Sequence, residues 1–153
     1  MRIGVISDTH GLLRPEALAF LQGSDRIVHA GDIGDARILD ALSAIAPLTV
    51  VRGNNDGAPW ADGVPDTALL EVGGLRLFAL HDLALLRIDP VAERIAVVVS
   101  GHSHRPLAER RGAVLYLNPG SAGPRRFKLP ISIAELRIEG GAITPRLVEL
   151  KSG

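Results

Sequence analysis

The chain has 153 residues and no formal net charge; 46% of its residues are hydrophobic, 3% are aromatic and none is cysteine. This length and composition are typical of one globular domain, and we expect residues 1–153 to form a single domain with an aliphatic core. The lack of cysteine excludes disulfides and thiolate metal sites, and zero net charge with few aromatics disfavours a nucleic-acid-binding surface.

No apolar stretch approaches the ~20 residues that a membrane span needs. The first two residues lead directly into a predicted strand, without the apolar region of a secretory signal. We therefore expect a cytoplasmic protein with no membrane partner. The sequence leaves the oligomeric state open, a homo-oligomer included.

The first third of the chain alternates strands with helices. Apolar runs predict buried strands at 3–6, 26–30 and 48–52. Between them, a proline in the first turn favours a short helix over 14–21, and apolar residues at helical spacing predict another over 36–46. This order indicates a parallel sheet with right-handed crossovers.

The rest of the chain is dominated by strands. The sequence predicts, in order, a loop at 57–66, a hairpin of 67–72 and 75–80, a loop with a short helix after Pro90 at 82–94, a buried strand at 95–100, short strands near Leu107 and at 113–117, a loop at 118–121 and a last hairpin over 131–150. A parallel half followed by an antiparallel half indicates an α/β fold in which two sheets pack face to face, with helices outside.

Five predicted strands end in polar residues of the kinds that bind metals. These residues are Asp8 and His10, Asp32, Asn54, His81, and His102 with His104. Ligands of open α/β sheets bind beyond the carboxyl ends of such strands. Side chains two residues apart in extended chain return to the same face, so Asp8 and His10 can converge on one ion.

The chemistry of these side chains points to a two-metal site. Imidazole and carboxylate together suit Mn, Fe, Ni or Zn better than Mg or Ca. Two ions about 3.5–4 Å apart, with a bridging carboxylate, lower the pKa of a shared water and clamp phosphate oxygens. We therefore expect two divalent metal ions, Mn foremost, in a phosphoesterase in which a metal-bridging hydroxide attacks phosphorus.

The ordered set of motifs resembles the calcineurin-like metallophosphoesterase superfamily. The motifs are Asp8-x-His10, Gly31-Asp32, Gly53-Asn54-x-Asp56, His81 and Gly101-His102-Ser103-His104. Two further segments are most similar to the small bacterial and archaeal phosphodiesterases of that superfamily: Ser7-Asp8-Thr9-His10-Gly11 and Asn118-Pro119-Gly120-Ser121. The resemblance covers residues 1 to about 150.

The resemblance implies a four-layer α/β/β/α sandwich of two mixed β-sheets, and it implies which residues hold each ion. One ion would be held by Asp8, His10, Asp32 and His104. The other would be held by Asp32, Asn54, His81 and His102, with Asp32 as the bridge.

Two positions depart from the family pattern. Many members have a histidine where this chain has Asn55, and that histidine is thought to protonate the leaving group. An amide cannot be a general acid, so the departure predicts a preference for good leaving groups, such as aryl or nucleotide-phosphate esters. At the second position the family usually has glycine, and this chain has Asp82. The Asp82 carboxylate could orient His81, or it could be a solvated acid of the loop.

Structural roles compete with metal binding at several positions. Asp8 and Asp32 could cap the helices that follow them, although capping does not explain ligand-type residues at five strand ends. Asn54 could be a turn residue, and His81 could be a core histidine. We interpret His29, within a predicted strand, as structural or as a support for a ligand.

The catalytic residues that we expect are Asn54, Asn55 and His102. The expected substrate contacts are Asn55, Arg125 and Arg126, although each arginine could be an ordinary surface residue. The loop at 118–121 could present backbone N–H groups to the site or could be a plain turn.

The predicted function is a metal-dependent phosphodiesterase that acts on a small phosphate ester. The alternative is a non-catalytic, metal-binding scaffold for protein interactions. A eukaryotic retromer subunit that resembles this family is thought to act in that way. Because this chain keeps every expected ligand, the enzyme is favoured.

Overall fold

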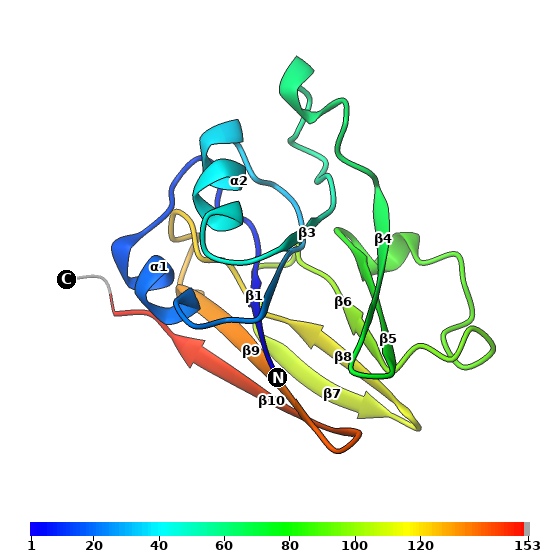
Figure 1. The fold of residues 1–153 in the computed structure, drawn as a ribbon. Coiled ribbons are helices and arrows are strands. Elements are labelled where there is room, and N and C mark those ends of the chain that lie inside the picture. The colour runs from blue at the N-terminus through cyan, green and yellow to red at the C-terminus, as the bar shows by residue number, and fades with distance from the viewer. Residues whose placement is uncertain (152–153) are drawn as a thin grey trace.

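The computed structural model describes residues 1–151 as two five-stranded sheets packed face to face (Figure 1). The elements are β1 (Arg2–Ile6), α1 (Pro15–Leu21), β2 (Arg26–His29), α2 (Ala36–Ser43), β3 (Leu48–Val50), η1 (Pro59–Ala61), β4 (Thr67–Val72), β5 (Leu75–Leu80), η2 (Leu83–Leu85), β6 (Val97–Val99), β7 (Leu107–Arg111), β8 (Val114–Asn118), β9 (Ser132–Glu139) and β10 (Ala142–Glu149). The first sheet has the order β10-β9-β1-β2-β3 and the second the order β4-β5-β6-β8-β7.

Each sheet combines three parallel strands with two strands in antiparallel pairing. Strands β1, β2 and β3 run parallel, and so do β5, β6 and β8. Strands β9 and β10 extend the first sheet in antiparallel pairing, whereas β4 and β7 do so for the second. The predicted strand-helix-strand-helix-strand order, both hairpins and the sandwich of two mixed sheets are confirmed.

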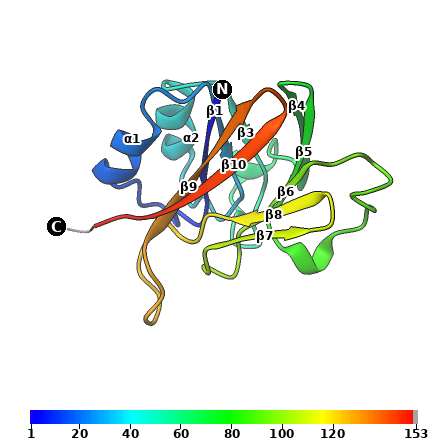
Figure 2. The ribbon, with the colours of Figure 1, turned by 90° about the horizontal axis from the view of Figure 1, so that it is seen from below.

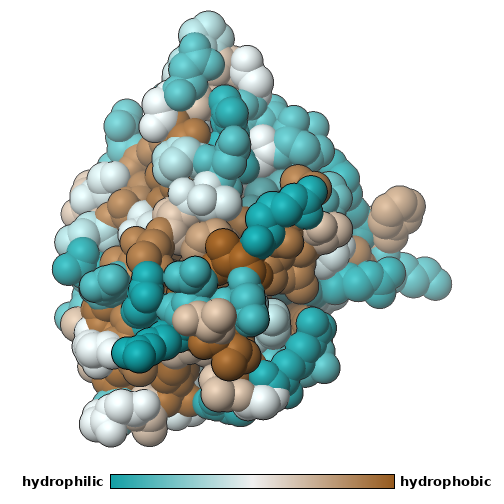
Figure 3. All heavy atoms as spheres, turned by 90° about the vertical axis from the view of Figure 1, so that its right-hand side faces the viewer, coloured by the Kyte–Doolittle hydropathy of each residue, from teal (hydrophilic) through white to brown (hydrophobic). Residues whose placement is uncertain are grey.

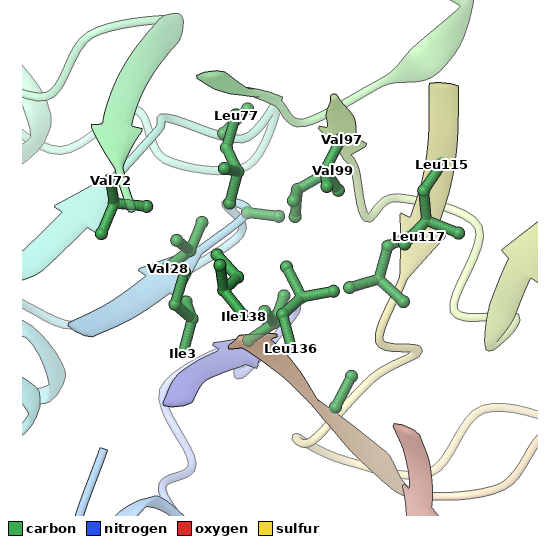
Figure 4. Close-up of a cluster of buried hydrophobic side chains, with 14 of the residues drawn as sticks. Ile3, Val28, Val72, Leu77, Val97, Val99, Leu115, Leu117, Leu136 and Ile138 are labelled. Atoms are coloured by element: carbon green, nitrogen blue, oxygen red, sulfur yellow. The ribbon is translucent and has the colours of Figure 1, made fainter. Parts of the chain in front are cut away.

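The main hydrophobic core lies between the two sheets. Side chains of the first sheet, such as Ile3 and Leu136, point toward Leu77, Val99 and their neighbours on the second (Figure 4). Successive side chains in a strand face opposite sides, so each buried strand contributes every second residue to this layer. Burial of this aliphatic surface is the main force that joins the sheets.

The two α-helices cover the outer face of the first sheet (Figure 2). Helix α1 buries Leu21 and helix α2 buries Ile38 and Leu42, and these side chains pack with Ile6 and Ile27 of the sheet. Asp35 caps α2, because its side chain accepts a hydrogen bond from the backbone N–H two residues on. No helix among residues 1–151 is long and apolar enough to cross a membrane.

The outer face of the second sheet is covered by the irregular segment 83–95 in place of an α-helix. Leu83, Leu86 and Ile88 pack against its buried residues. The short helix predicted after Pro90 is wrong. Asp89 accepts hydrogen bonds from the backbone N–H groups of the next turn, and that single turn ends at Arg94, whose φ is 57°. The fourth layer of the expected sandwich is therefore a loop with one 3-10 turn at η2.

A buried carboxylate joins the edge of the first sheet to α1. Glu135 on β9 is 2% exposed and accepts hydrogen bonds from Arg2 at 2.9 Å, Arg137 at 2.8 Å and Arg146 at 3.0 Å. Arg2 also donates to the carbonyl of Phe20 in α1, at 2.5 Å. Burial alone would raise the pKa of Glu135, but the three guanidinium groups lower it from 4.5 to about 2.

We expect Glu135→Gln to lower the free energy of unfolding by about 1–3 kcal/mol at pH 7, because an ionised acceptor shared by three arginines is lost. The folded pKa lies below the unfolded pKa, so this stabilisation is present above about pH 4.5 and is lost as the pH falls toward 2. Urea denaturation of wild type and variant at pH 7 and pH 3 measures the difference.

The control is Glu109→Gln, which removes an exposed carboxylate that pairs with Arg111 at 3.3 Å. Surface pairs contribute little, so a change below about 0.5 kcal/mol is expected there. A Glu135→Gln effect that is the same at both pH values would contradict the assigned role of the charge.

Candidate metal centre

The carboxyl ends of the parallel strands in both sheets meet at one edge of the sandwich. Asp8 and His10 follow β1, and Asp32 follows β2. His81 follows β5 directly, and the loop after β6 carries His102 and His104. Because the sheets are packed face to face, ligand-type side chains from both reach the same place.

Five of these side chains form two overlapping groups. Asp8, His10 and His104 have ligating atoms within 4.8 Å of one another, and so do Asp8, Asp32 and His81. His104 Nε2 is 3.3 Å from Asp8 Oδ1, and His81 Nε2 is 3.3 Å from Asp32 Oδ2. His10 Nε2 is 3.7 Å from a carboxylate oxygen of each aspartate. The two carboxylates thus lie between the imidazoles.

Hydrogen bonds at the far side of two ligands leave their inner atoms free. Asp8 Oδ2 accepts from the Ser7 hydroxyl at 2.6 Å and from the backbone N–H of His102 at 3.1 Å. His81 Nδ1 lies 2.7 Å from the carbonyl of Ala30, which assigns its proton to Nδ1 and a lone pair to Nε2. Asp8 Oδ1 and His81 Nε2 are buried and have no hydrogen-bond partner. Such orphaned lone pairs, facing one another, fit a cation.

The electrostatics of the site keep both aspartates ionised. Burial alone would raise the pKa of Asp32, but the nearby imidazole of His81 and the hydrogen bond from the Asn55 backbone lower it far below its usual range. Burial likewise opposes the ionised form of Asp8, and the nearby imidazole of His10 and the hydrogen bond from Ser7 lower its pKa. Burial lowers the pKa of His81, but the nearby Asp32 carboxylate and the contact with the Ala30 carbonyl raise it overall.

Five ligand-type residues have a left-handed backbone. The φ angles are 55° at Asp8, 46° at His10, 55° at Asp32, 71° at His102 and 63° at His104. This conformation costs a non-glycine residue about 1 kcal/mol or more. Strained backbone concentrates where function requires a particular side-chain direction. The clustering of five such residues at one edge marks that edge as the candidate functional site.

Two glycines allow the ligand loops to approach closely. A Cβ at Gly53 would collide with the Asp32 carboxylate and backbone, and one at Gly101 would collide with the side chains of Ser7 and Asp8. Each glycine directly precedes a predicted ligand, Asn54 or His102. The Gly-Asn and Gly-His pairs are therefore requirements of packing at the site.

Two predicted ligands lie at the rim and outside the close groups. His102 has a side chain that is 46% exposed, and its ring lies edge-on to that of His81 at 5.2 Å. Asn54 is exposed and lies beside the same cavity as His81. Asp82 does not orient His81: it caps η2 and its Oδ2 lies 3.9 Å from His102 Nε2. The carbonyl of Ala30 orients His81 instead.

Asn55 bonds directly to Asp32, one of the predicted metal-binding residues. Its backbone N–H donates to Asp32 Oδ1 at 2.9 Å, and its side-chain amide donates to Asp32 Oδ2 at 3.1 Å. Sequence reasoning assigned Asn55 to catalysis and substrate contact. The structure adds a role that the sequence did not indicate, in which Asn55 holds the carboxylate of Asp32.

Other supports of the site were only partly visible in the sequence. His29 is structural, as predicted, because its ring bonds to Thr9 Oγ1 and to the Gly31 backbone N–H, both at 3.0 Å. Burial lowers the pKa of His29 to about 4. Asp56 was missed as a support: its carboxylate accepts from three backbone N–H groups that join the loops after β2 and β3. Its place in the motif Gly53-Asn54-x-Asp56 gave no sign that its side chain points inward.

The loop at 118–121 holds two neighbouring loops in place through hydrogen bonds. Asn118 donates to the carbonyl of Gly101 at 2.9 Å, and the Ser121 hydroxyl donates to the carbonyl of Asp8 at 3.0 Å. The N–H groups of Gly120 and of Ala122 bond within the protein, so this loop does not offer them to a ligand.

The two arginines that are predicted to contact the substrate lie in the exposed loop that follows residues 118–121. Arg125 donates to the carbonyl of Leu129 at 3.3 Å. The pKa of His104 is lowered, chiefly by burial. The Asp8 carboxylate raises this pKa, whereas the positive charge of Arg126 lowers it further.

We expect Gly53→Ala to weaken Mn²⁺ binding by at least about tenfold, because the added methyl group displaces the carboxylate of Asp32. Calorimetric titration of metal-stripped protein measures the affinity. The matched control is Gly57→Ala, where an added Cβ meets nothing within 4 Å. Equal affinities of the two variants would contradict the role of Gly53.

The relatives of this chain carry phosphoesterase names. The "probable metallophosphoesterase MJ0623" of Methanocaldococcus jannaschii is 35% identical in an alignment of 152 positions, gaps included, that covers 91% of this chain and 77% of that protein. Phosphodiesterase YfcE of Escherichia coli K12 is 28% identical in an alignment of 166 positions, gaps included, that covers 89% of this chain and 87% of YfcE.

Two solved structures share the fold. An archaeal phosphodiesterase matches with a TM-score of 0.79 at 24% identity, over 97% of this chain and 100% of its own. Vps29 of Chaetomium thermophilum matches with a TM-score of 0.78 at 22% identity, over 98% of this chain and 97% of its own. Both confirm the predicted sandwich of two sheets.

Residues 1–141 match the calcineurin-like phosphoesterase superfamily domain. That range contains both groups of ligating side chains, whose carboxylate and imidazole atoms suit a divalent metal ion. The order of motifs, the fold and this match agree, and the chain belongs to the calcineurin-like phosphoesterase superfamily.

Proposed function

We propose that this protein is a phosphodiesterase that depends on two divalent metal ions, Mn²⁺ foremost. The observation that carries the proposal is the pair of overlapping groups at one edge, in which buried Asp8 Oδ1 and His81 Nε2 have no other partner. Asp8, His10, Asp32 and His104 would hold one ion. The second would be held by Asp32, Asn54, His81 and His102.

The position of Asp32 supports its role as the bridge. Its Oδ2 lies 3.7 Å from His10 Nε2, in the first proposed set, and 3.3 Å from His81 Nε2, in the second. Asp8 Oδ1 also faces imidazoles of both sets, at 3.3 Å from His104 and 3.9 Å from His81. Either carboxylate is placed to serve two ions.

Two bound divalent ions supply a hydroxide nucleophile near neutral pH and neutralise charge on the phosphate oxygens. The protein's own residues orient the ligands and carry part of the charge. Asn55 and Ser7 hold the aspartates through hydrogen bonds. The exposed ring of His102 and the amide of Asn54 lie at the rim, where they can approach the phosphate of a substrate. Arg125 and Arg126 are the proposed contacts to its outer oxygens.

The second candidate is a metal-binding scaffold for protein interactions. The likeness in fold to Vps29 is the observation that supports it. The two candidates differ in one measurable property, because only the enzyme turns over a phosphate ester when metal is added. Names of relatives favour the enzyme, since YfcE is named a phosphodiesterase.

We expect metal-stripped protein to hydrolyse bis-p-nitrophenyl phosphate only after a divalent metal is added, and Asp32→Asn to abolish this turnover. The amide has neither the charge nor the acceptor capacity to serve two ions. Mn, Ni, Zn and Mg are added singly, with p-nitrophenyl phosphate as the monoester for comparison. Asp40→Asn on the exposed face of α2 is the control and is expected to keep wild-type turnover. Tight metal binding without turnover of either ester would favour the scaffold.

We also expect Asn55→His to raise the ratio of alkyl to aryl ester turnover, by on the order of 10²-fold, because an imidazole can protonate a poor leaving group. The variant also removes the amide bond to Asp32. Asn55→Ala removes only that bond, so it is expected to slow both esters and leave the ratio as in wild type. If the histidine variant has the same ratio as the alanine variant, the wild type does not lack a leaving-group acid at this position.

A further inference from the structure

Two cavities are lined by residues of the metal edge, and Asp82 lines both. The smaller, of about 340 Å³, lies beside Asn54 and His81. The larger, of about 540 Å³, lies behind His102. Because the ring of His102 is 5.2 Å from that of His81, the mouth of the larger cavity adjoins the proposed metal groups. A substituent on a phosphate bound there could enter it.

The lining of the larger cavity is mostly apolar. Leu83 of η2, Pro106, Leu107 of β7, Tyr116 of β8 and Leu129 form its walls. It lies on the outer face of the second sheet, where the segment 83–95 takes the place of a helical layer. Figure 3 views this side of the molecule and shows hydrophobic side chains exposed among hydrophilic ones.

Asn118 is a polar residue of the cavity wall whose side chain is already hydrogen-bonded within the protein. Asn118 donates to Gly101 and to Ser103, at 2.9 and 3.1 Å, and its carbonyl oxygen accepts from the Gly120 backbone. Arg111 covers one face of the Tyr116 ring, with its guanidinium carbon 4.4 Å from the ring centroid. This wall therefore offers apolar and aromatic surface to a ligand, and the exposed residues His102 and Arg105 also line the cavity.

We propose that this cavity binds an aromatic ester group of the substrate, of up to nucleoside size. This inference rests on the proposed function, because the metal groups would hold the phosphate from which the ester group extends past His102. The volume is that of a small-molecule site. An aromatic group would bury its faces against Tyr116 and the leucines, and the hydrophobic effect would favour it over an alkyl group of one carbon.

The test is binding of phenylphosphonate and methylphosphonate to Mn²⁺-loaded protein, measured by calorimetry. The two probes share the phosphonate, differ only in the apolar group, and are not hydrolysed because the carbon is bonded directly to phosphorus. We expect phenylphosphonate to bind about tenfold more tightly to the wild type.

Two variants change the cavity without touching the proposed metal ligands. Tyr116→Ala removes its aromatic wall, and Leu107→Trp fills it from a position on β7 that is 40% exposed. In both variants the preference for the phenyl probe is expected to fall to about twofold, while the methyl probe binds as before. Leu147→Trp, at an exposed position of β10 in the other sheet, is the matched control and is expected to keep the wild-type preference.

Equal binding of both probes to the wild type, or an unchanged preference in both cavity variants, would overturn the inference. Binding of neither probe to Mn²⁺-loaded protein would overturn it too. Its failure is distinguishable from that of the proposed function. Hydrolysis without a preference for the phenyl probe contradicts only the proposed aromatic subsite. A preference for the phenyl probe without hydrolysis contradicts only the proposed enzymatic activity.

Discussion

The structure depends on holding two buried carboxylates side by side at one edge of the sandwich. Asp8 is fully buried and Asp32 is 3% exposed, and both are kept ionised by the imidazoles and N–H groups around them. Two like charges in such a place repel each other and lose their hydration. The imidazoles supply part of the compensation, and a divalent cation would supply the rest. The burial of negative charge is thus the constraint to which the neighbouring loops conform.

The backbone at this edge is specialised to meet that constraint. Neither the left-handed conformation of five ligand-type residues nor the close approach at Gly53 and Gly101 improves the packing of the core. These features direct ligand-type side chains to one edge from four loops, those after β1, β2, β3 and β6, that the two sheets bring together. The sandwich supplies the frame, since its parallel strands end at a common edge and its aliphatic core fixes the separation of the sheets. The bonds from Asn118 and Asp56 then join the loops to one another.

The sequence was sufficient for the sheets and for most of the site, but not for the contacts between loops. Alternating apolar residues and the spacing of the ligand motifs depend on local chain geometry, so strands and strand ends could be predicted from them. The bond of Asn55 to Asp32 joins residues 23 apart, and the pairing of Asp82 with His102 also joins two loops. Such contacts follow from three-dimensional packing, which a local pattern does not encode. The turn after Pro90 resembles a helix start in sequence, because proline is also common in the first turn of a helix.

The cost of the site bears on the choice between an enzyme and a scaffold. An interaction surface can be built from exposed side chains in relaxed conformations, and it has no need of orphaned polar atoms in the interior. Here Asp8 Oδ1 and His81 Nε2 are buried without partners, and each such atom destabilises the fold unless something binds it. A purely structural ion could satisfy both atoms in a closed cage. This site is instead open at His102 and Asn54 and is flanked by two cavities. A structural metal site is closed, with every coordination position filled by the protein. An open rim beside cavities is instead typical of a site that exchanges a small substrate.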